Sequence, residues 1–139
     1  MVDMADGFED RFKGVLFGQA VGDALGLGTE FMSRAQVRDK YPDGLSAYEQ
    51  IIRDAHRKRW KRGDWTDDTE QMTLIVDSLL EKKEVEVCDI ARRFAHWEGQ
   101  GGLGIGDTVY AVLHHPRFHA DPHCAAKEIW ESTDRWQAA

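Results

Sequence analysis

Residues 8–25 constrain the fold more than any other stretch, because their apolar side chains recur every three or four positions. These side chains are Phe8, Phe12, Val15, Leu16, Val21 and Leu25. Glycine and alanine fill many of the positions between them, and so many glycines weaken a helix. Such a helix is tolerated only where another backbone packs very close or where a ligand approaches. The pattern therefore predicts a helix at the centre of the fold.

Helical spacing continues further along the chain. Ser33 is placed to cap a short helix at Arg34–Lys40. Thr66 is placed to cap a longer helix, because acidic residues follow it and favour the positive end of the helix dipole. The apolar stripe of this longer helix consists of Met72, Ile75, Val76, Leu79 and Leu80.

The C-terminal half has the same character. Asp89 is expected to cap a helix that runs to Glu98, and further helices are expected at 107–114 and 122–136. No segment alternates convincingly between apolar and polar residues with period two. The sequence therefore predicts an all-α fold in which residues 1–139 form a single domain.

Composition excludes several classes of protein. Eighteen basic and 25 acidic side chains give a net charge of −7, which makes nucleic acid an improbable partner. The uncharged stretch 14–22 is too short to cross a membrane, and the acidic residues before it are unlike a secretory signal. Cys88 and Cys124 lie far apart without metal-binding spacing, so we expect two reduced thiols in a cytoplasmic protein.

The segment 63–69 carries the strongest chemical signal. Asp64, Asp67 and Asp68 place three carboxylates within five residues, and they repel one another unless a cation or solvent screens them. With the hydroxyl of Thr66 they offer only oxygen ligands, which suit Mg²⁺, Mn²⁺ or Ca²⁺. The neighbouring Trp65 could shield such a cluster from water. Consecutive carboxylates in the first turn of a helix are also common as plain capping, and the acids alone favour that interpretation.

Two further segments are open to two interpretations each. Glu30 beside Phe31 is either a surface residue after a helix or a base that acts on a water molecule. The glycine-rich run 99–108 is either a flexible connection or a loop whose N–H groups hold a diphosphate. Prolines interrupt the histidine group, which we interpret as a polar loop and which consists of His114, His115, His119 and His123.

Taken together and in order, these motifs resemble the N-terminal half of the ADP-ribosylglycohydrolase family. The resemblance rests on 13–26 (KGVLFGQAVGDALG) with Glu30-Phe31, on 63–72 (GDWTDDTEQM) and on 104–108 (GIGDT). It extends from about Phe12 to the end of the chain. It implies an all-α orthogonal helical bundle that hydrolyses the bond between ADP-ribose and an acceptor, which is a protein side chain or a small molecule, with a pair of Mg²⁺ ions.

The resemblance also implies roles for particular residues. Thr66, Asp67 and Asp68 correspond to the N-terminal metal ligands, and Glu30 corresponds to the catalytic or gating glutamate. The loop that holds the diphosphate corresponds to Gly102, Gly104, Ile105 and Gly106. The expected binding partner is ADP-ribose or an ADP-ribosylated substrate.

One departure from the family pattern is large. Family members are typically about twice this length, still the size of one domain, and carry a second ligand set, Asp-x-Asp-Thr, near their C-terminus. This sequence contains no such motif. We therefore expect an incomplete bundle with half of the metal site, completed by self-association or by a missing C-terminal half. The alternative is a non-catalytic protein, either crystallin-like or specialised in binding ADP-ribose.

Overall fold

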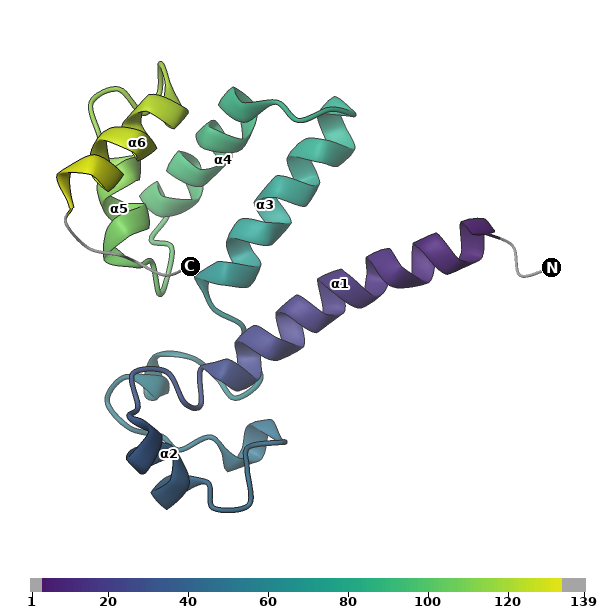
Figure 1. The fold of residues 1–139 in the computed structure, drawn as a ribbon, viewed down its shortest axis with the longest axis vertical. Coiled ribbons are helices and arrows are strands. Elements are labelled where there is room, and N and C mark those ends of the chain that lie inside the picture. The colour runs from purple at the N-terminus through teal and green to yellow at the C-terminus, as the bar shows by residue number, and fades with distance from the viewer. Residues whose placement is uncertain (1–3, 134–139) are drawn as a thin grey trace. The chain divides into compact units, whose positions relative to one another are not determined.

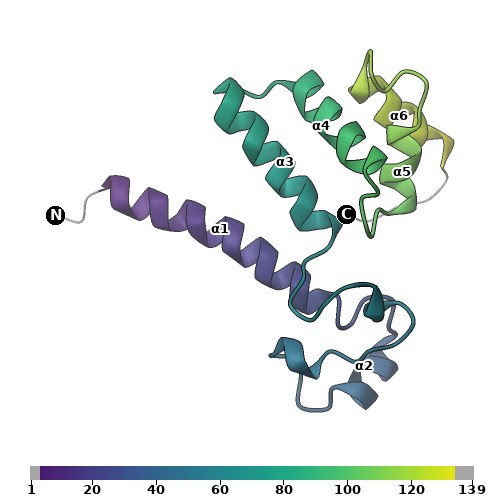
Figure 2. The same ribbon diagram turned by 180° about the vertical axis from the view of Figure 1, so that it is seen from behind.

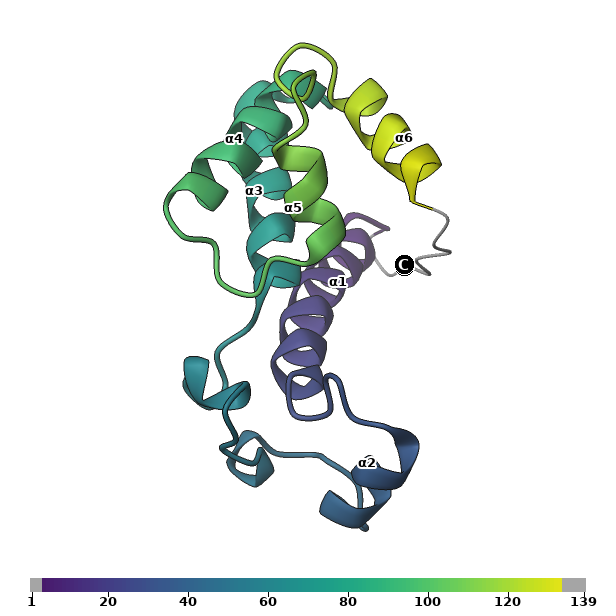
Figure 3. The same ribbon diagram turned by 90° about the vertical axis from the view of Figure 1, so that its left-hand side faces the viewer.

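The computed structural model describes residues 4–133, which form helices connected by turns and loops (Figure 1). The α-helices are α1 (Met4–Gly26), α2 (Arg34–Lys40), α3 (Asp67–Lys82), α4 (Val87–Gly99), α5 (Asp107–Leu113) and α6 (Pro122–Ser132). Two short 3-10 helices, η1 (Tyr48–Gln50) and η2 (Arg57–Arg59), lie between α2 and α3 (Figure 3). The described residues contain no strand, and the predicted all-α class is confirmed.

The chain divides into two compact units, residues 1–69 and residues 70–139. The prediction of a single domain stays a prediction. Within residues 4–133, none of the helices combines the length and apolar character needed to cross a membrane.

Buried side chains hold the first unit together behind the C-terminal end of α1. Tyr41, which directly follows α2, donates its hydroxyl proton to the carbonyl oxygen of Gly28 at 3.0 Å and accepts the N–H of Ile52 at 3.3 Å. A Cβ atom at Gly28 would lie 2.4 Å from the Leu45 side chain, so a larger residue there would displace that side chain. The apolar residues buried in this unit are Ala24, Leu27, Tyr41, Ile51 and Trp60.

Most of α1 departs from the central position that the sequence predicts. Phe8, Phe12 and Phe17 are exposed, and only the end of the helix is buried within the first unit. No heavy atom lies within 4 Å of a Cβ built at Gly18 or Gly22, so the expected close backbone is absent from this described unit. These glycines instead line a cavity, which agrees with the other expectation, that of an approaching ligand.

The second unit packs α4, α5 and α6 around a small core (Figure 2). The core consists of Ala91, Leu113, Phe118 and Ala125. α3 and α4 run antiparallel, since Arg93 on α4 binds Glu81 near the end of α3 and the Trp97 indole donates to Glu70 near its start. Polar side chains therefore join α4 to α3 near both ends of the pair.

Two predicted helix boundaries are wrong. α4 begins three residues earlier than predicted, because the Glu86 side chain accepts the N–H of Cys88 and serves as the cap. Asp89 lies inside the helix, 3% exposed, where it accepts a hydrogen bond from Arg93 Nε at 2.6 Å. α6 ends at Ser132 instead of 136, because Thr133 adopts an extended backbone; Trp136 lies outside the described residues.

Asp89 gives the second unit a predicted dependence on pH. The hydrogen bond from Arg93 is the main cause that lowers the pKa of Asp89 from 3.8 to about 2. A carboxyl group with a lowered folded pKa stabilises the fold above about pH 4, and this contribution disappears as the pH falls through about 2. We expect Asp89→Asn to lower the midpoint of thermal unfolding by several degrees at pH 7.

Thermal unfolding followed by circular dichroism from pH 7 to pH 2 checks this expectation. The difference between wild type and Asp89→Asn should shrink between pH 4 and pH 2. Glu84→Gln is the matched control, because Glu84 is an exposed acid in the turn before α4. A difference that stays constant down to pH 2 would contradict the assignment.

Candidate functional site

Asp23, near the end of α1, accepts hydrogen bonds from residues at the start of α3. Its Oδ2 accepts the N–H groups of Thr66 and Thr69 at 2.9 and 3.1 Å. Both threonine hydroxyls donate to the same carboxylate at 2.6 Å, that of Thr66 to Oδ1 and that of Thr69 to Oδ2. Thr66 stands directly before α3 as predicted, but a carboxylate distant in sequence accepts N–H groups at the start of the helix.

A cavity of about 400 Å³ opens beside this contact. It is bounded by one face of the end of α1, by the turn that follows α1, and by the start of α3. Its lining residues are Gly18, Gln19, Gly22, Asp23, Gly26, Leu27, Glu30, Thr66 and Asp68. The structure thus brings three of the predicted site residues, Glu30, Thr66 and Asp68, to one cavity within the first unit.

Like charges concentrate around this cavity. Burial is the main cause that raises the pKa of Asp67 to about 6, and the negative charges of Asp68, Asp23 and Glu30 raise it further. The pKa of Asp68 is raised by partial burial and by the charges of Asp23 and Glu30, although its side chain stays open to solvent. Asp67 does not line the cavity, but its carboxyl group is electrostatically coupled to the residues that do.

Asp64, the third acid of the sequence motif, has a structural role in the turn before α3. Its Oδ2 accepts the backbone N–H of Lys61 at 2.8 Å and closes the turn before α3. The acids that join Asp67 and Asp68 are therefore Asp23 and Glu30, which come from another part of the chain. Trp65 is 47% exposed, so the expected shielding is at most partial.

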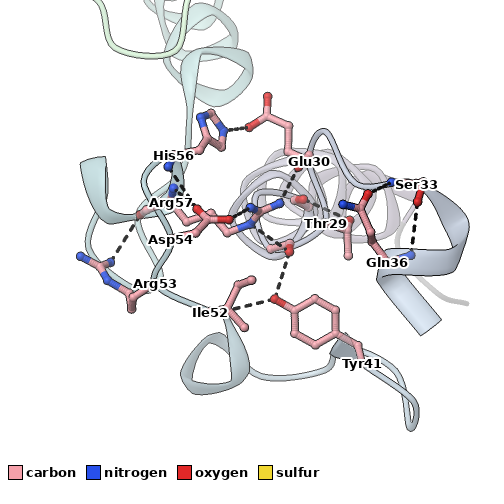
Figure 4. Close-up of polar contacts among 12 residues, drawn as sticks. Thr29, Glu30, Ser33, Gln36, Tyr41, Ile52, Arg53, Asp54, His56 and Arg57 are labelled. Carbon is pink, nitrogen blue, oxygen red and sulfur yellow. Dashed lines mark hydrogen bonds and ion pairs between the residues drawn. The ribbon is translucent and has the colours of Figure 1, made fainter. Parts of the chain in front are cut away.

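Glu30 is held at the edge of the cavity by the segment around η2. Its carboxylate Oε2 lies 2.6 Å from Nε2 of His56, and the Arg57 guanidinium donates to its backbone carbonyl (Figure 4). Arg57 is 4% exposed and also binds the carbonyl of Gly28 and the Asp54 carboxylate. The backbone N–H of Arg57 is the main cause that lowers the pKa of Asp54, with its guanidinium contributing.

The predicted metal ligands are of a suitable chemical type for a hard divalent cation. The Thr66 hydroxyl gives its proton to Asp23, which leaves its oxygen lone pairs available to a cation. A bound cation would reduce the repulsion between these crowded carboxylates, whose pKa values are raised. Within residues 4–133, no three His, Cys, Asp or Glu side chains converge on a metal position, and the metal assignment stays a prediction.

The glycine-rich run belongs to the second unit. Gly101 and Gly104 have φ values of +91° and +99°, which glycine adopts without strain. A Cβ at Gly102 would lie 2.6 Å from the Trp97 ring, and Ile105 packs against the core of the unit. These observations explain the glycines as packing and turn residues, and the predicted binding role of 102–106 stays a prediction.

Two residues of the site were missed by reasoning from the sequence. Asp23 is the only charged residue in 14–26, a stretch otherwise made largely of apolar and small residues, and that isolation was a signal. His56 lies in a basic segment with weak periodicity and carried no such signal. Both make contacts between positions 26 or more residues apart, which local patterns do not contain.

Comparison with known proteins gives consistent matches. The family model described as ADP-ribosylglycohydrolase matches residues 4–137. The chain is 36% identical over 106 residues to ADP-ribosyl-[dinitrogen reductase] glycohydrolase of Rhodospirillum rubrum, covering 71% of this chain and 32% of that protein. It is 35% identical over 119 residues to ADP-ribosylhydrolase ARH3 of Danio rerio, covering 81% and 28%.

A third relative is ADP-ribosylarginine hydrolase Tri1 of Pseudomonas putida, 30% identical over 105 residues, with 74% of this chain and 25% of the relative covered. The chain therefore aligns with no more than about a third of the length of these relatives.

The contact between Asp23 and α3 leads to a prediction about stability. Replacing Asp23 by alanine removes a charged acceptor from four donors. Loss of one hydrogen bond to a charged group typically costs about 1.5–3 kcal/mol, and water that enters the cavity takes over part of the role of the lost acceptor. Relief of the repulsion with Asp67 and Asp68 offsets part of the loss. We expect Asp23→Ala to lower the free energy of unfolding by about 1–3 kcal/mol in urea denaturation.

Asp10→Ala provides the control, because Asp10 is an exposed acid on the same helix. If both variants unfolded at the same urea concentration, the contact would not contribute to stability.

Proposed function

The chain belongs to the ADP-ribosylglycohydrolase family, and from this premise we propose that it hydrolyses, with Mg²⁺, the glycosidic bond between ADP-ribose and an acceptor. The acceptor is a protein side chain or a small molecule. The observation that carries the proposal is the cavity of the first unit, where Glu30, Thr66 and Asp68 meet although they come from distant segments.

Thr66, Asp67 and Asp68 are the residues that would hold the metal ion. They supply oxygen ligands of the type that Mg²⁺ prefers. Asp23 supports this set, because its carboxylate takes the Thr66 proton and fixes the oxygen at the start of α3. Bound Mg²⁺ would supply positive charge that polarises ribose hydroxyl groups and stabilises the transition state.

Glu30 is proposed as the general base. Its carboxylate reaches the cavity from the turn after α1 and is held there by His56. In the hydrolysis, a water oxygen bonds to ribose C1 while the bond from C1 to the acceptor breaks. The electron pair of the broken bond stays on the acceptor. Glu30 takes one water proton and returns it to the leaving acceptor, so that the carboxylate is regenerated and the atoms balance.

The cavity also suits part of a sugar ligand by its shape. Gly18, Gly22 and Gly26 lie one turn apart on α1 and line the cavity, and no heavy atom occupies the space where their side chains would be. Larger residues at these positions would fill that space. We propose that these glycines admit the ribose close to the helix backbone.

Release of ADP-ribose from an ADP-ribosylated arginine peptide, with and without Mg²⁺, tests the proposed function. We expect Asp67→Asn combined with Asp68→Asn to abolish Mg²⁺ binding in calorimetric titration while far-UV helicity stays at the wild-type level. We expect the rate of release to fall at least about 100-fold, as removal of a catalytic ion requires.

Asp64→Asn is the matched control, because Asp64 neighbours the cluster in sequence but closes a turn outside it. Unchanged Mg²⁺ affinity in the double variant would refute the metal assignment. Binding of ADP-ribose without any hydrolysis would favour a non-catalytic, ADP-ribose-binding protein.

A further inference from the structure

His56 forms a contact with Glu30 that the resemblance to the family did not suggest. The imidazole Nε2 lies 2.6 Å from Oε2 of Glu30, across 26 positions of sequence. The side chain of His56 is 26% exposed and that of Glu30 39% exposed, so water competes only partly for this bond. The close-up shows the two side chains pointing toward each other from different segments (Figure 4).

The imidazole ring of His56 is fixed by its surroundings. Its edge contacts involve Phe31 and Trp60, with ring centroids 5.1 and 5.2 Å away. Its backbone N–H donates to Asp54 Oδ1 at 3.1 Å. Trp60 is 5% exposed and belongs to the core of the first unit. The ring therefore has aromatic neighbours in two segments of the first unit.

The backbone that carries Glu30 is held by the same segment. Arg57, next to His56, donates to the carbonyl oxygens of Gly28 and Glu30. Phe31 has a φ of +58°, a left-handed conformation that residues other than glycine rarely adopt. One short segment thus fixes both the backbone around Glu30 and its carboxylate.

We propose that His56 is a positioning residue that holds the Glu30 carboxylate at the cavity. The contact joins Nε2 of the ring to Oε2 of the carboxylate, and in the proposed arrangement Nε2 is the donor and Oε2 the acceptor. A glutamate side chain has three rotatable bonds, and the bond to His56 removes much of this freedom before a ligand arrives. Only Oε2 takes part, and among the described residues Oε1 accepts no hydrogen bond.

The catalytic consequence rests on the proposed function. If Glu30 acts as the base, Oε1 is the oxygen left to take the water proton, and its position depends on the bond that His56 makes to Oε2. Loss of this bond would lower kcat and leave KM nearly unchanged, because His56 is not among the residues that line the cavity.

A purely structural role of the ring predicts a different pattern among variants. His56→Phe keeps an aromatic ring between Phe31 and Trp60 but removes the donor. The amide nitrogen of His56→Gln reaches about the position of Nε2, whereas the shorter amide of His56→Asn reaches that of Nδ1. Positioning therefore predicts that glutamine preserves function and that asparagine and phenylalanine do not, while a packing role favours phenylalanine.

The experiment has a spectroscopic arm that needs no substrate. Long-range ¹H–¹⁵N spectra of the 139-residue chain should report a protonated Nε2 on His56, whose resonance shifts in Glu30→Gln. His123, an exposed histidine in the other unit, is the internal control and should not shift. A His56 resonance that does not respond to Glu30→Gln would overturn the proposal, whatever the activity.

The kinetic arm measures Mg²⁺-dependent release of ADP-ribose from an ADP-ribosylated arginine peptide. We expect kcat to fall about tenfold in His56→Phe and His56→Asn with KM within about twofold, and to stay within about threefold in His56→Gln. Adding His56→Phe to Glu30→Gln should lower kcat little further, because both changes disable the same Glu30–His56 pair. Wild-type kcat in His56→Phe, or fully additive losses, would overturn the proposal.

The two arms separate the two hypotheses. A wild-type chain that releases no ADP-ribose, but whose His56 resonance responds to Glu30→Gln, would overturn the proposed function and support the pair. An active chain whose His56 resonance does not respond to Glu30→Gln would support the proposed function and overturn the positioning role of His56.

Discussion

The candidate site of this protein depends on the contact between the Asp23 carboxylate and the start of α3. It joins the end of α1 to the start of α3 by accepting four hydrogen bonds from Thr66 and Thr69. The first N–H groups of a helix lack partners within the helix, and here a side chain from a distant segment provides one. The same contact aligns Thr66 and Asp68 with the wall of the cavity that α1 forms.

This arrangement has an electrostatic cost. Asp23, Glu30, Asp67 and Asp68 lie close enough to raise the pKa of Asp67 to about 6, with burial as the largest cause. Nothing in capping alone requires so many carboxylates around one cavity. Asp67 lies beside the cavity and is coupled to the acids that line it, and carboxyl groups with strongly shifted pKa values are typical of functional sites. Hydrogen bonds from the backbone to Asp23 and from Arg57 to the backbone oppose this repulsion.

Most of the helices could be predicted from local patterns. Ser33 caps α2 as predicted, and α3 starts directly after Thr66. The errors occurred where side chains compete for one role. Asp89 looks like a cap in the sequence, yet Glu86 provides the cap and Asp89 is buried against Arg93. Likewise, Asp64 belongs to the acidic motif by position, but the N–H of Lys61 draws it into a turn.

The sequence by itself determined the helical class, the positions of most helices, the family, and the identity of Glu30, Thr66, Asp67 and Asp68 as candidates. Periodicity, capping and short motifs are local, so they are visible without a structure. Only the tertiary structure decided that Asp23 and His56 belong with them, and that Asp64 does not. The contacts to Thr66 and Glu30 bridge 43 and 26 positions, and such distant pairs form only when the chain folds.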